Sequence, residues 1–88
     1  MKAILTVIGQ DKVGIIAVVS QKLADLDINI LDVSQTIMEE YFTMTMMLQL
    51  KQNADFENIK KELHSVGVKL GVKINIQNEE IFNAMHKL

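Results

Sequence analysis

The sequence contains no cysteine, and this absence excludes disulfide bonds, thiolate metal sites and a cysteine nucleophile. No apolar run approaches the roughly 20 residues that a membrane-spanning helix needs. The start of the chain, Met1-Lys2-Ala3, lacks the long apolar stretch of a signal peptide. We therefore expect a cytoplasmic protein that does not interact with membranes.

Arginine is absent as well, since all nine basic residues are lysines, and the net charge is −2. Arginine makes the bidentate contacts to guanine and phosphate, so an acidic chain without it is a poor candidate for binding nucleic acid. An acylphosphatase would need an arginine cradle for phosphate, and a metal chaperone of similar size would need cysteine. We expect no enzymatic activity and no cofactor.

With 88 residues, the chain is expected to form one domain, residues 1–88. A domain of this size buries only about 60–65% of its unfolded surface, so its core is marginal and self-association is a common remedy. The absence of proline also matters, because proline would block pairing at an exposed sheet edge.

Changes in apolar periodicity predict six main elements. Strands are expected at residues 3–8, 28–38, 41–50 and 72–77, and long helices at residues 15–26 and 56–70. The adjacent Ile30 and Leu31 break the alternation of the second strand, which indicates a bulge or an edge strand. Glu39-Glu40 is the expected turn before the third strand.

The second long helix has recognisable ends, with Asp55 as N-cap and Gly71 as C-terminal stop. Asn78 is expected to cap a further short helix at the end of the chain. Its apolar stripe would consist of Ile81, Phe82, Met85 and Leu88. The order β-α-β-β-α-β therefore predicts a ferredoxin-like α+β fold: a four-stranded antiparallel sheet with two helices on one face, plus a short C-terminal helix.

Alternation in the third strand separates the two faces of this sheet. Phe42, Met44, Met46, Leu48 and Leu50 are expected to face the helices, which makes the methionines core residues rather than copper ligands. The opposite face is mixed, with Thr43, Thr45 and Met47, and takes either Ile4 and Ile8 or Leu5 and Val7 from the first strand. We expect the C-terminal helix or a second subunit to cover part of it.

The segment Gly9-Gln10-Asp11-Lys12-Val13-Gly14-Ile15 joins the first strand to the first helix. Two glycines and an acid at such a turn form a concavity where the free N–H groups of the helix start favour an anion. On its own, the segment is more readily explained as a glycine turn in which Asp11 acts as a local cap, and only Asn29 and the pattern of the whole chain bring the binding interpretation level with it. Asn29, at the start of the second strand, could likewise hydrogen-bond its own backbone.

The pattern Gly9-x-Asp11-x-x-Gly14-Ile15, followed by Asn29-Ile30 and set in a βαββαβ chain of this size, resembles the ACT domain family. The resemblance covers Lys2 to about Ile76 and is strongest to free-standing single ACT-domain proteins, which are similar to the ACT modules of glycine-cleavage regulators. It implies a regulatory module that binds amino acids or related metabolites. It also implies pairing through the second strand, with ligand held between the turn of one subunit and Asn29 of the other.

The resemblance gives the site residues distinct roles. The backbone near Val13, Gly14 and Ile15 would hold a carboxylate, while Asp11 and Asn29 would accept hydrogen bonds from an ammonium group. Gly9 belongs to the turn, and Ile30 adjoins Asn29. The family often has Arg-Pro where this chain has Lys12-Val13, and often a polar side chain at the position of Gly9.

Two function hypotheses follow. The first is a non-catalytic homodimer that binds an amino acid and signals to an unknown downstream protein; the alternative is a protein-interaction module with an empty ligand site. His64 and His86 are far apart in the sequence and have no evident third ligand, so we interpret them as surface residues and expect no metal site.

Overall fold

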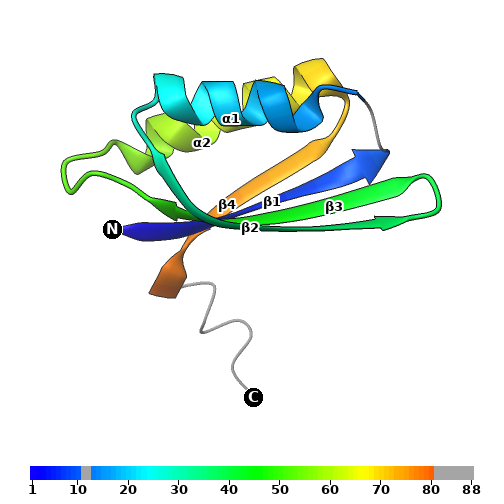
Figure 1. The fold of residues 1–88 in the computed structure, drawn as a ribbon. Helices are drawn as coiled ribbons and strands as arrows, with labels where there is room; N and C mark the ends of the chain where they lie inside the picture. Colours follow the sequence, from blue (N-terminus) through cyan, green and yellow to red (C-terminus); the bar gives the residue numbers. More distant parts are fainter. Residues whose placement is uncertain (11–12, 81–88) are drawn as a thin grey trace.

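The computed structural model describes residues 1–10 and 13–80. The elements follow the predicted order: β1 (Lys2–Gln10), α1 (Ile15–Asp25), β2 (Asn29–Met38), β3 (Tyr41–Gln49), α2 (Phe56–Leu70) and β4 (Lys73–Asn78). The strands form one antiparallel sheet in the order β2-β3-β1-β4, with both helices on the same face (Figure 1). The ferredoxin-like prediction is confirmed. The apolar stripe of the expected C-terminal helix, residues 81–88, lies outside the described residues.

The ends of α2 confirm the predicted caps. The Asp55 carboxylate accepts a hydrogen bond from the Asn58 backbone N–H at 3.2 Å, which satisfies one of the orphan donors of the helix start. Gly71 ends the helix in the left-handed region with φ 70°, where glycine carries no steric penalty. Helix α2 continues through Gly67, and the Val72 N–H then donates to the Gly67 carbonyl at 3.0 Å.

The core lies between the two helices and the face of the sheet that they cover. The β3 residues assigned to this face by alternation are all buried, as predicted. The register resolves the open choice in β1, because Leu5 lies opposite Met46 and Val7 opposite Met44, both of which are core residues. Leu5 and Val7 therefore face the helices, and Ile4 and Ile8 lie on the open face.

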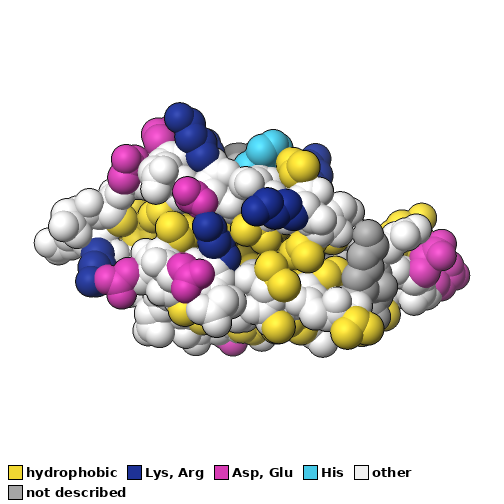
Figure 2. Space-filling model, turned by 90° about the horizontal axis from the view of Figure 1, so that it is seen from above, with side chains coloured by type: hydrophobic (Ala, Val, Ile, Leu, Met, Phe, Trp, Pro, Cys, Tyr) yellow, Lys and Arg dark blue, Asp and Glu magenta, His cyan; other side chains and the backbone are white. Residues whose placement is uncertain are grey.

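Strand β2 is one edge of the sheet, as predicted, and its register shifts between Ile30 and Asp32, which confirms the expected irregularity at Leu31. Beyond the shift, Val33 and Ile37 lie opposite core residues of β3 but remain 45% and 54% exposed. The helices do not cover this edge, and Figure 2 shows apolar side chains gathered on the side of the molecule that α1 and β2 border.

The opposite edge, β4, is different in character. It has only six residues, with the sequence KINIQN, and begins with the exposed Lys73. Short edge strands and edge lysines discourage pairing with another chain. The sheet therefore has one long apolar edge and one short polar edge.

Candidate ligand site

The turn between β1 and α1 brings several of the predicted site residues to one end of the sheet. Gly9 lies in β1 opposite Phe42, and Gly14 is the N-cap of α1. The Val13 side chain is fully exposed, whereas that of Ile15 is buried in the core, so Ile15 offers the turn only its backbone. Asp11 lies outside the described residues, and its predicted role remains a prediction.

Gly14 has the geometry of an accessible helix start. Its φ is 90°, a left-handed conformation that side chains rarely adopt, and a Cβ placed there would meet no atom within 4 Å. The Val18 N–H donates a hydrogen bond to the Gly14 carbonyl at 2.9 Å, which is the first hydrogen bond of the helix. Because Gly14 has no side chain, it cannot cap the backbone N–H groups in the first turn of α1, and no acidic residue lies in that turn. Within residues 1–10 and 13–80, no side chain caps the electropositive end of α1, which favours an anion.

A hollow of about 410 Å³ lies beside this helix start. Its walls come from the start of α1, from the far half of β2 and from Phe42 of β3. They consist of Gly14, Ile15, Ile16, Ala17, Gln35, Ile37 and Phe42. Gln35 and Ile37 are not among the predicted site residues, although the two-residue alternation of a strand, counted from Val33 beyond the bulge, places both on the helix side of the sheet. The hollow is apolar apart from Gln35 and the helix backbone.

Gly9 has a packing reason for lacking a side chain. A Cβ at this position would lie 2.7 Å from Cγ1 of Val72 and 3.3 Å from its Cα, which is too close for ordinary contact. The absence of a side chain at this position is therefore accounted for by the close approach of the chain just before β4.

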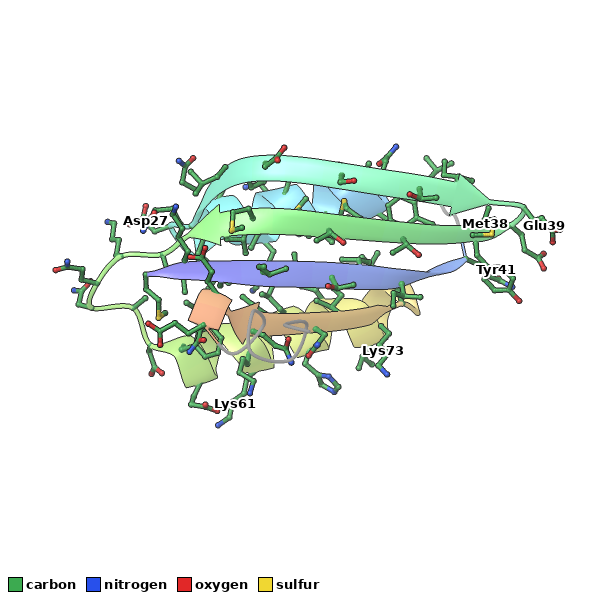
Figure 3. The ribbon with its side chains drawn as sticks, turned by 90° about the horizontal axis from the view of Figure 1, so that it is seen from below. Asp27, Met38, Glu39, Tyr41, Lys61 and Lys73 are labelled. Carbon is green, nitrogen blue, oxygen red and sulfur yellow. The ribbon has the colours of Figure 1, made fainter. Side chains whose placement is uncertain are left out.

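Asn29 and Ile30 lie at the other end of the sheet. Asn29 is opposite Gln49, which is opposite Lys2, whereas Gly9 is seven residues further along β1. Seven strand residues span about 24 Å, so one chain does not bring Asn29 to the Gly14 turn. Figure 3 shows this separation, with Asp27 at one end of the sheet and the Met38–Tyr41 hairpin at the other.

A second hollow, of about 380 Å³, surrounds Asn29. It lies between the end of α1 and the start of β2, and its walls include Ala24, Asp27 and Lys51. Asp27 and Lys51 form an exposed ion pair there, so this hollow is more polar than the one beside Gly14. Edge strand β2 thus carries one hollow at each end.

Other chemistry in the described part of the chain is sparse. Residues 1–10 and 13–80 contain no group of three or more His, Asp or Glu side chains able to hold a metal ion. Among the helices that the structure describes, none has the length and apolar character needed to cross a membrane. His64 is exposed on α2, and His86 falls outside the described residues. The Lys22 ammonium, 2.7 Å from the Glu62 carboxylate, lowers the pKa of Glu62 by hydrogen bonding and charge, remote from both hollows.

Comparison with known proteins decides the family. A family model described as an ACT domain matches residues 2–77. The chain belongs to the ACT domain family. This ACT domain is 63% identical over 89 residues to a UPF0237 protein of Listeria innocua, covering 100% of both chains.

Solved structures agree with this assignment. An ACT domain protein from Streptococcus pneumoniae is 50% identical with a TM-score of 0.85, covering 98% of each chain. The regulatory subunit of aspartate kinase from Thermus thermophilus is 22% identical with a TM-score of 0.70, covering 89% of this ACT domain and 51% of that chain. At that identity, the second match supports the fold alone.

Proposed function

We propose that residues 1–88 act as one cytoplasmic, non-catalytic regulatory unit: a homodimer that binds a small molecule, an amino acid, and signals to another protein. The observation that carries the proposal is the pair of hollows at opposite ends of the same exposed edge strand. Membership of the ACT domain family supports a ligand-binding regulatory role.

Pairing of β2 with β2 of a second copy would join the two halves of a site. A two-fold axis at the centre of the strand sets the start of one β2 beside the end of the other, because paired strands related in this way are antiparallel. The Asn29 hollow of one subunit would then adjoin the Gly14 hollow of its partner. The exposed Val33 and Ile37 supply apolar contact along the same edge.

The chemistry of the joined site suits a zwitterion. The N–H groups at the start of α1 would hold a carboxylate, and the Asn29 amide oxygen with Asp11 would accept hydrogen bonds from an ammonium group. Ile16 and Ile37, from the walls of the Gly14 hollow, would surround an apolar side chain. Since ligand would contact both subunits, its binding favours whichever subunit arrangement completes the site.

Thermal-shift screening of the purified protein against the twenty amino acids tests ligand binding. A ligand at 100 times its dissociation constant should stabilise the protein by about 2.7 kcal/mol. Asn29→Ala should strongly reduce the shift, because it removes one of the two proposed acceptors for the ammonium group. Asn75→Ala is the matched control: it makes the same truncation at an exposed position on β4, away from both hollows, and should leave the shift intact.

Subunit mixing tests whether the site is shared. Asp11→Ala and Asn29→Ala each damage both sites of their own homodimer, but a mixed dimer of the two variants contains one intact site. Isothermal titration of the mixture should therefore recover ligand binding, with up to half the sites active in each mixed dimer. Binding that stays absent in proven mixed dimers would place both residues in one subunit's site and refute the arrangement.

The alternative is a protein-interaction module whose ligand site is empty. The close approach of Val72 favours it, because it explains Gly9 by packing instead of by ligand contact. A stable homodimer that shows no thermal shift with any amino acid or common metabolite would support this alternative over the ligand-binding proposal.

A further inference from the structure

The face of the sheet turned away from the helices has no cover among residues 1–10 and 13–80 (Figure 3). In β1 and β3, this face carries a mixture of threonine and apolar side chains. These residues are Ile4, Thr6, Ile8, Thr43, Thr45 and Met47. A shallow surface of this kind accommodates a short apolar element laid across it.

The two ends of this open face differ. Ile4 and Ile8 project from the same side of β1, yet Ile4 is 7% exposed and Ile8 is 47% exposed. Thr45 and Met47, next to Ile4, are also less exposed than Thr43, which lies next to Ile8. The enclosed end is therefore the one at which β4 leaves the sheet, where Asn78 pairs with Ala3.

A hollow of about 150 Å³ lies at this enclosed end. Ile4 and Met47 supply apolar walls, and Asp32 and Ser34 of β2 border it. An apolar cavity of roughly this volume is large enough for a benzene molecule, so the hollow has the size of one aromatic ring.

The end of the chain provides a matching element. Ten residues, 79–88, follow β4, and Glu79 and Glu80 are already helical. A helix of ten residues would extend about 15 Å, and the distance across four strands is about 14 Å. The apolar residues recur at positions 81, 82, 85 and 88, which is one stripe of a helix.

We propose that residues 81–88 pack this stripe across the open face of their own chain, with the Phe82 ring in the hollow between Ile4 and Met47. Phe82 is four residues beyond Asn78, and Met47 is two strands away from it, about 10 Å across the sheet. One helical turn and an aromatic side chain cover that distance. The open face would then be occupied within the chain, so that the β2 edge is the apolar surface left for association. This inference does not depend on the proposed function.

The direct test is nuclear Overhauser contact in the full-length protein. Contacts between the Phe82 ring and the methyl groups of Met47 and Ile4 are expected. A sample mixed from differently labelled chains separates contacts within a chain from contacts between chains. Contacts found only between chains would make a second copy the occupant and overturn the proposal, and so would the absence of contacts in a spectrum with assigned Phe82 signals.

A double-mutant cycle tests the same contact by stability. Phe82→Ala should raise the unfolding equilibrium constant roughly tenfold or more in the wild-type chain, and much less in a Met47→Ala background, because the two truncations remove the same contact. Asn83→Ala is the matched control: its position lies opposite the stripe, so its effect should be small and additive with Met47→Ala. Additive effects of Phe82→Ala and Met47→Ala would overturn the proposal.

Discussion

Replacing Gly67 with alanine tests how tightly α2 packs on the start of β4. In an exposed helix interior, Gly→Ala stabilises by about 1 kcal/mol, because alanine loses less backbone entropy. Here the added Cβ would lie 2.9 Å from the Val72 carbonyl oxygen and 3.3 Å from Cγ1 of Ile74. The first contact is with backbone, which moves only if the turn that carries the Gly67–Val72 hydrogen bond moves too. Overpacking of this kind costs about 1–3 kcal/mol, so we expect net destabilisation by about 1 kcal/mol.

Urea denaturation followed by far-ultraviolet circular dichroism measures this effect, at a fixed protein concentration because association would also alter the midpoint. Ser65→Ala is the control, because Ser65 is exposed on the same helix and alanine there should stabilise by up to about 0.5 kcal/mol. If Gly67→Ala stabilised the protein as much as its helix propensity predicts, the packing argument would be refuted.

Three further predictions concern single contacts. Gly9→Ala should destabilise by about 1–3 kcal/mol in urea, and less in a Val72→Ala background; equal losses in both backgrounds would contradict the contact with Val72. The lowered pKa of Glu62 means that its pairing with Lys22 stabilises the fold above pH 4.5 and is lost as the pH falls through the lowered pKa, so Lys22→Ala should reduce the acid-dependent drop in melting temperature. Gly14→Val should cost about 1–2 kcal/mol through its positive φ alone, and Gly14→Asn less; equal losses measured by urea denaturation would point to steric conflict instead.

The sequence predicts those parts of the fold in which local chemistry and burial agree. Alternation in β3 identifies the core face because that strand has one apolar and one mixed side. Asp55 and Gly71 mark the ends of α2 because capping is a local requirement. In β1, apolar residues point to both faces of the sheet, so the two-residue alternation does not show whether Leu5 or Ile4 faces the helices. The pairing of β1 with β3 shows that it is Leu5.

The candidate site was predictable only in part. Gly14 stands out in the sequence as a glycine between a strand and an apolar helix, and its positive φ in the structure favours glycine. The importance of Gln35 and Ile37 depends on how far α1 extends over β2, which no local pattern encodes. Asn29 lies about 24 Å from the turn it is proposed to serve, so its role depends on a partner chain, and a single sequence carries no direct signal of that geometry.

The unequal edges of the sheet limit how large an assembly can grow. A chain with two adhesive edges adds copies without end and forms a fibril, because each new copy exposes another edge. Here β4 is short and polar while β2 is long and apolar, so pairing through β2 uses the one adhesive edge of both copies. In the proposed homodimer, growth would then stop at two copies. If the proposed pairing through β2 holds, substitutions that lengthen β4 or replace Lys73 should make the dimer prone to polymerise.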